Sequence, residues 1–231
     1  ERLRGWATTP LRQAHHVVAS GSCMARLLLR TGVEAKNLTV ISPWLDADYL
    51  EDKLKNKPIE GAAQLQHGQA LKARRLYSDP AGQKFRALWD AHGSQAPALQ
   101  TLVDTARLLQ KTQPDIEICC VGAGPFFDDL AKERARFSLD NIRLMPPQPR
   151  PMLKALYESG DIHVVAMGED QAGLYVPAGL ELALAVERPV IFLGPSESDV
   201  ARVLVRMGGG RVVKPLDVKG FATAISQFRN D

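Results

Sequence analysis

The stretch from Asp161 to Gly194 constrains the fold of this chain more than any other. Residues 161–166 form a short apolar run rich in β-branched side chains, and residues 168–177 form a polar loop that contains glycine. Good helix formers fill residues 178–186, and residues 190–193 are a second apolar run. This order predicts a strand–helix–strand unit whose two strands are parallel and buried on both faces.

The same alternation continues on both sides of this unit, from Lys84 to the end of the chain. We expect strands at residues 85–89, 115–121, 141–145, 161–166, 190–193 and 211–213, separated or followed by helices at 98–111, 126–137, 152–159, 178–186, 198–207 and 218–228. Strands that alternate with helices are typical of an α/β fold with one doubly wound parallel sheet. Right-handed crossovers then bring the loops that follow the strands to one edge, where open α/β sheets bind ligands.

The part of the chain before Lys84 has a weaker pattern. Residues 16–19 and 37–42 are expected to be strands, with a helix from Ser20 or Ser22 to Arg30 that one of these serines would cap. We therefore predict the end of an amino-terminal α/β domain over residues 1–49, a linker with short helices over 50–83, and a Rossmann-like domain over 84–231.

Composition excludes several classes of protein. The formal net charge of +3 is small for 231 residues and does not indicate a nucleic-acid partner. Three cysteines do not make a disulfide framework, and no apolar run approaches the ~20 residues of a membrane span. The small number of cysteines fits a reducing compartment, so we expect a cytoplasmic protein. Because the sequence does not begin with Met, we also expect it to be part of a longer chain.

Several catalytic motifs are absent or incomplete. In VGAGPF the third glycine of a dinucleotide fingerprint would fall on Phe127, which argues against a Rossmann dehydrogenase. The sequence has no Walker lysine motif and no G-x-S-x-G elbow. No histidine has a paired metal-ligand spacing, so no metal site is expected. His163 lies in a strand and is expected to be a core residue, whereas His92, in a strand-end loop, stays a candidate catalytic residue.

Six blocks in order resemble the carboxyl-terminal half of a GT-B glycosyltransferase. They are KFRALWDAHG, VGAGPFFDDLAKE, NIRLMPPQPRPMLKALYESGDIHVV, GLYVPAGLELALAVERPVIF and SESDVARVLVRMGGGRVVKP, preceded by HHVVASGSCMARLLLRTGVEAKNLTVISPWLD, which is similar to the end of the amino-terminal domain. The match is most similar to family 4, the retaining transferases, in a branch that builds bacterial surface polysaccharides.

The resemblance implies a donor site for a nucleoside diphosphate sugar, which is a substrate and not a cofactor. The base would lie against residues 145–148 and the diphosphate over residues 173–179, where the first amides of a helix favour an anion. The implied donor-binding residues are Gly93, Gly122, Gly124, Met145, Pro147, Gln148, Gly173, Leu174, Tyr175, Val176, Pro177, Ala178, Gly179 and Glu181. The resemblance further implies a lipid-linked or glycan acceptor, a peripheral contact with the inner membrane, and chemistry that needs no metal.

Four positions depart from the family pattern. Its phosphate-binding lysine falls on Gly179, its two glutamates fall on Leu174 and Leu182, and Ala91 stands where a glycine is common. Because lost charged contacts weaken donor binding, a degenerate GT-B-like domain with a binding or scaffolding role is an alternative. A sugar-nucleotide epimerase of the same fold is a second alternative.

Overall fold

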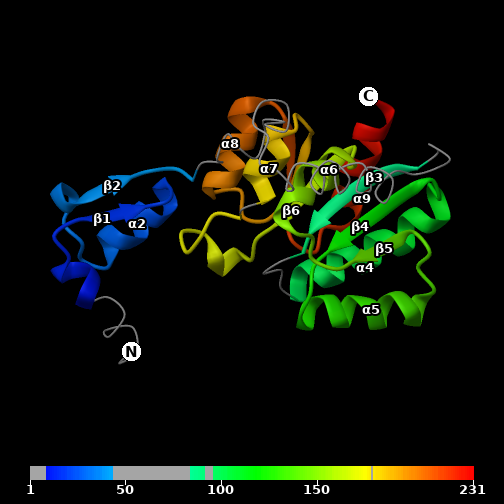
Figure 1. The fold of residues 1–231 in the computed structure, drawn as a ribbon, viewed down its shortest axis with the longest axis horizontal. Coiled ribbons are helices and arrows are strands. Elements are labelled where there is room, and N and C mark those ends of the chain that lie inside the picture. Colours follow the sequence, from blue (N-terminus) through cyan, green and yellow to red (C-terminus); the bar gives the residue numbers. More distant parts are fainter. Residues whose placement is uncertain (1–8, 44–83, 92–95, 178) are drawn as a thin grey trace, which may run out of the picture.

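The computed structural model describes residues 9–43, 84–91, 96–177 and 179–231. They form two parts (Figure 1). The amino-terminal part begins with helical residues 9–13 and continues with β1 (Val17–Ala19), α2 (Ser22–Arg30), the short 3-10 helix η1 (Ala35–Asn37) and β2 (Leu38–Val40). Its two strands pair in parallel, with Val17 opposite Leu38. The predicted linker over residues 50–83 lies outside the described residues.

The second part is one parallel sheet of six strands. Its strands are β3 (Phe85–Asp90), β4 (Ile116–Val121), β5 (Ile142–Met145), β6 (Ile162–Ala166), β7 (Val190–Leu193) and β8 (Gly210–Val213). They lie in the order β5-β4-β3-β6-β7-β8, and every neighbouring pair is parallel. The doubly wound α/β sheet predicted from the sequence is confirmed.

Helices cover both faces of this sheet. One face carries α4 (Ala96–Thr112), α5 (Pro125–Phe137) and α9 (Val218–Asn230), and the other carries α6 (Leu153–Glu158), α7 (Gly179–Ala185) and α8 (Asp199–Met207). Short 3-10 helices η4 (Arg150–Met152) and η5 (Glu169–Gln171) precede α6 and follow β6.

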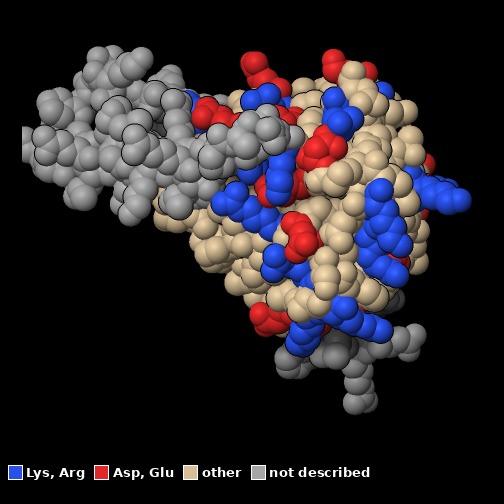
Figure 2. Space-filling model, turned by 90° about the vertical axis from the view of Figure 1, so that its right-hand side faces the viewer, with Lys and Arg blue, Asp and Glu red and all other residues tan. Residues whose placement is uncertain are grey.

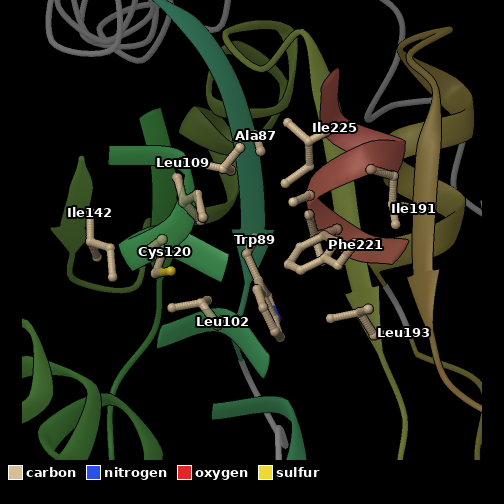
Figure 3. Close-up of a cluster of buried hydrophobic side chains, with 14 of the residues drawn as sticks. Ala87, Trp89, Leu102, Leu109, Cys120, Ile142, Ile191, Leu193, Phe221 and Ile225 are labelled. Atoms are coloured by element: carbon tan, nitrogen blue, oxygen red, sulfur yellow. The ribbon is translucent and has the colours of Figure 1, made fainter. Parts of the chain in front are cut away.

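Each face has its own hydrophobic core because successive strand residues point to opposite faces. On β3, Ala87 and Trp89 belong to the core under α4 and α9, whereas Leu88 belongs to the core under α6, α7 and α8. Trp89 is fully buried between Leu102 and Phe221, whose ring meets the indole edge-on (Figure 3). β4 is buried over its whole length, as expected for a central parallel strand.

The cysteines of β4 are core residues. Burial raises the pKa of the Cys119 thiol to about 11 and that of Cys120 well above its usual value. Both therefore stay protonated and unreactive near neutral pH, as the apolar strand around them predicts.

The predicted serine cap of α2 is wrong. The N-cap residue is Gly21, and no side chain of the amino-terminal part caps the helix. Instead the amide of Cys23 donates to Asp199 Oδ2 of α8 at 2.7 Å. The carboxylate that satisfies the start of α2 thus comes from a helix 176 residues away in sequence, and it joins the two parts of the chain.

Candidate functional site

The sheet has one place where its strand order reverses. From β3 the chain winds outward through β4 and β5, and then returns to add β6 on the other side of β3, followed by β7 and β8 (Figure 1). The helices that follow β3 and β6, α4 and α7, therefore lie on opposite faces of the sheet. Ligands of open α/β sheets bind at such a switch point, beyond the carboxyl ends of the strands.

A cavity of about 100 Å³ lies at this switch point; we call it the switch-point cavity. Asp90, the last residue of β3, and Ala166, the last residue of β6, both line it. The other lining residues include Tyr157, His163, Tyr175, Pro177 and Gly179.

Asp90 is held by a chain of buried groups. The Tyr157 hydroxyl donates to Asp90 Oδ2 at 3.1 Å, and the Tyr157 ring stacks on the His163 ring with centroids 4.8 Å apart. His163 Nε2 lies 3.0 Å from the carbonyl oxygen of Tyr157. The buried His163 is thus a hydrogen-bonded core residue, as the sequence predicts.

The protonation states fit this arrangement. Burial lowers the pKa of His163 to about 4, so its imidazole is neutral near pH 7 and can donate Nε2–H to the carbonyl. Burial, and then the negative charge of Asp90, raises the pKa of Tyr157 well above its usual range. Tyr157 therefore remains a hydrogen-bond donor at all moderate pH values, and it fixes the direction in which the carboxylate points.

Gly179, the first residue of α7, forms part of the wall of the switch-point cavity. A Cβ added at Gly179 would lie 3.2 Å from the Tyr157 hydroxyl and 3.7 Å from Asp90 Cβ. Any longer side chain at residue 179 would need Tyr157 to move. The Leu180 amide, in the first turn of α7, donates to the Pro177 carbonyl at 3.2 Å.

A larger cavity of about 330 Å³ lies beyond the end of β6 and shares one lining residue, Ala166, with the switch-point cavity; we call it the edge cavity. Glu169, Asp170 and Gln171 of η5 form one wall, and Leu193 and Leu216 contribute to the opposite side. The Gln171 side-chain oxygen fixes the η5 turn by accepting from the Gly168 amide at 2.8 Å and from the Tyr175 hydroxyl at 3.1 Å.

Some of the predicted donor-binding residues lie away from both cavities. Gly122 donates its backbone amide to the Met145 carbonyl at 3.0 Å, where β4 and β5 end, and the side-chain Nε2 of Gln148 donates to the Pro146 carbonyl. Gly124, at φ 91°, is the N-cap residue of α5. The predicted group of Gly122, Gly124, Met145, Pro147 and Gln148 therefore occupies the same sheet edge as the cavities without lining them.

The predicted loop over residues 173–179 divides between several surroundings. Tyr175, Pro177 and Gly179 line the switch-point cavity, and Leu174 is 58% exposed. Val176 and Glu181 line a different cavity of about 490 Å³, between the amino-terminal part and helices α7 and α8. Burial raises the pKa of Glu181.

Gly173 has a separate role. It has φ 89°, and a Cβ there would lie 2.9 Å from the Cys23 carbonyl oxygen, so this glycine lets the loop pack against α2. Leu182, where the family has a glutamate, is packed against the core under α6, α7 and α8. His92, Gly93 and Ala178 lie outside the described residues.

Sequence reasoning missed Asp90 and Tyr157. The available signal was the acidic residue that ends the apolar run FRALWD, at a strand's carboxyl end.

Within the described ranges, no group of three or more His, Cys, Asp or Glu side chains could hold a metal ion. The described helices include none long and apolar enough to cross a membrane. Figure 2 shows basic and acidic side chains intermixed on the face drawn there.

Comparison with solved structures finds the same fold over nearly the whole chain. HepE from Anabaena, solved with UDP and glucose, is 17% identical with a TM-score of 0.72, over 99% of this chain and 57% of that one. Sucrose-phosphate synthase from Thermosynechococcus elongatus is 19% identical with a TM-score of 0.69, over 99% of this chain and 52% of that one.

A third structure, WaaG, a glycosyltransferase involved in lipopolysaccharide biosynthesis, is 14% identical with a TM-score of 0.60, over 93% of this chain and 53% of that one. The chain thus spans little more than half the length of these GT-B neighbours. No curated protein matches it. Residues 91–231, more than half of the chain, match the model of a sequence family, and the chain belongs to that family, the glycosyl transferases group 1.

Proposed function

We propose that this chain is the donor-binding half of a nucleotide-sugar-dependent glycosyltransferase of the GT-B type. The observation that carries the proposal is the switch-point cavity between β3 and β6, together with the edge cavity beyond the ends of β6 and β7, on a domain of the group 1 family. That place is where an open α/β sheet presents loops and helix starts to a ligand.

The likeness to HepE favours a uridine nucleotide. HepE was solved with UDP and glucose and also with UDP-glucose. In this chain we assign the base to residues 145–148 and the diphosphate to the loop over residues 173–179, as the sequence resemblance implies. Transfer would retain the anomeric configuration and need no metal, with backbone N–H groups stabilising the leaving diphosphate.

The rest of the enzyme would lie outside this chain. Residues 1–49 would be the end of an acceptor-type domain, and the acceptor would be a lipid-linked molecule or a glycan. We place the chain in the family 4 branch of surface-polysaccharide or glycolipid synthesis, as a cytoplasmic protein in peripheral contact with the inner membrane. The support is the motif order in the sequence and the likeness to WaaG, which is involved in lipopolysaccharide biosynthesis.

One observation favours a second candidate, a degenerate GT-B-like domain with a binding or scaffolding role. Gly179 carries no cation, and the nearby space is filled by the Tyr157 hydroxyl and the acidic Asp90. A diphosphate at the start of α7 would have to tolerate that carboxylate.

Titration calorimetry of the chain with UDP-glucose, GDP-mannose and ADP-glucose separates the two candidates. The proposal predicts saturable binding of one of them, UDP-glucose first. Gly179→Met should weaken binding at least 10-fold, because its side chain would displace Tyr157 and fill the switch-point cavity. The matched control is Gly209→Met, since a Cβ at Gly209 meets nothing within 4 Å. A folded chain that binds none of the three nucleotide sugars contradicts the proposal and supports the degenerate domain.

A further inference from the structure

The switch-point cavity has an acidic character. Among the described residues that line it, Asp90 is the sole acidic side chain, and none is a lysine or arginine. Asp90 Cβ lies 3.7 Å from the position that a Gly179 Cβ would take, so the carboxylate is close to the start of α7. The positive end of that helix is therefore already next to a negative group of the protein itself.

This charge decides which part of a ligand the cavity can take. A phosphate placed beside Asp90 would meet a like charge in a partly desolvated space, which is unfavourable. A hydroxyl group would instead donate a hydrogen bond to the carboxylate, and such charge-assisted bonds are the stronger kind.

The size of the cavity leads to the same conclusion. Its volume of about 100 Å³ is well below the ~300–1,000 Å³ of sites that hold a whole small molecule. It can hold one polar portion of a ligand, while the remainder lies outside it, over the loop of residues 173–179.

The carboxylate is built into the fold and is not a mobile surface group. Tyr157, which is 2% exposed, donates its hydroxyl to Asp90 Oδ2, and the stacked His163 ring supports Tyr157 from below. An ionised carboxylate can accept about four hydrogen bonds, so it can accept from the Tyr157 hydroxyl and from a ligand hydroxyl at the same time.

We propose that Asp90, positioned by Tyr157, accepts a hydrogen bond from a hydroxyl of the donor's sugar, so that the switch-point cavity is a sugar subsite and the diphosphate lies outside it. This inference rests on the proposed function. Asp90 touches the substrate in this account, and Tyr157 is a positioning residue.

The test compares affinities with and without the sugar. The nucleotide sugar used is whichever of UDP-glucose, GDP-mannose and ADP-glucose binds most tightly. Calorimetry gives its dissociation constant and that of the matching nucleoside diphosphate, which lacks the sugar. Their ratio, sugar-free over sugar-bearing, isolates the contribution of the sugar. Asp90→Asn should lower this ratio by roughly 10-fold or more, as expected for a lost hydrogen bond to a charged group. The affinity for the sugar-free diphosphate should stay the same or rise.

Two further variants keep the result interpretable. Tyr157→Phe keeps the ring but removes the hydroxyl that positions the Asp90 carboxylate, and it should lower the ratio by a smaller factor. Asp129→Asn, on the exposed face of α5, removes a charge far from the cavity and should leave the ratio unchanged.

An unchanged ratio in Asp90→Asn overturns the inference and leaves the donor-binding function standing. An equal gain in affinity for both ligands also overturns it, because the carboxylate would then act only by repelling phosphate. Absence of binding of every nucleotide to the folded wild-type chain contradicts both proposals.

Discussion

The buried ion pair between β3 and β4 allows a prediction with a definite size. Arg86 and Glu117 are opposite each other in the register of the two strands, with Arg86 Nε 2.9 Å from Glu117 Oε2. Their side chains are 5% and 8% exposed, and the exposed Lys84 adds a longer contact of 3.4 Å to the same carboxylate. Glu117→Leu would remove the carboxylate that pairs with the buried Arg86 guanidinium.

The cost follows from this geometry. Charges about 4 Å apart interact by about 4 kcal/mol at an effective dielectric constant of 20. Removing one partner of a buried pair costs a similar ~3–5 kcal/mol. We expect Glu117→Leu to lower the free energy of unfolding by about 4 kcal/mol, and Tm by roughly 8–16 °C for a domain of this size.

Urea unfolding followed by circular dichroism measures this change. Asp115→Asn is the control, since Asp115 pairs with Arg229 at the surface, where such pairs contribute ~1 kcal/mol or less. The double variant Arg86→Met/Glu117→Leu should recover most of the loss, because it removes both charges of the pair. A Glu117→Leu chain within ~1 kcal/mol of wild type, or a double variant as unstable as the single one, would refute this reasoning.

Three further predictions concern protonation, thiols and the contact between the two parts. Burial lowers the pKa of His163 from its usual 6.5 to about 4 in the folded chain. As the pH falls below 6.5, the unfolded chain therefore binds a proton before the folded chain does. The free energy of unfolding should be constant above pH 6.5 in this respect and fall by ~3 kcal/mol towards pH 4. His163→Phe should flatten that slope in urea titrations at several pH values, and an unchanged slope would assign it to other groups. A thiol reagent should modify Cys23 alone in the native chain and three thiols after unfolding, and more than one native thiol would contradict the burial of β4. Asp199 Oδ2 accepts a hydrogen bond from the Cys23 amide, and a Cβ at residue 21 would collide with that carboxylate oxygen. Gly21→Ala should therefore lower the protection of the Cys23 amide against hydrogen exchange about 10-fold. Equal protection in the two chains would count against this contact.

The sequence was sufficient to predict the sheet and its helices because the relevant signals are local. A central parallel strand such as Ile116–Val121 is a continuous apolar run, and α4 has an apolar stripe at helical spacing. The strand Val190–Leu193, which ends the strand–helix–strand unit of residues 161–194, has the predicted bounds. Most other helices and strands differ from their predicted bounds by one or two residues at their ends.

The parts that sequence reasoning missed depend on contacts between distant residues. The cap of α2 comes from Asp199, so a search for a nearby serine could not find it. The hydrogen bond between Asp90 and Tyr157 joins residues 67 positions apart, and it forms because β3 lies beside β6. Strand order is not encoded in the local pattern, so the sequence predicted a site at this edge of the sheet but not that Asp90 lines a cavity there.

The most direct test of the central claim is a crystal structure of the chain with UDP-glucose at saturating concentration. The account predicts the nucleotide sugar beyond the carboxyl ends of β3 and β6, with a sugar hydroxyl within hydrogen-bond distance of an Asp90 oxygen and the diphosphate over the loop of residues 173–179. A nucleotide sugar bound at another place on the molecule, or one whose phosphates occupy the switch-point cavity, would contradict it.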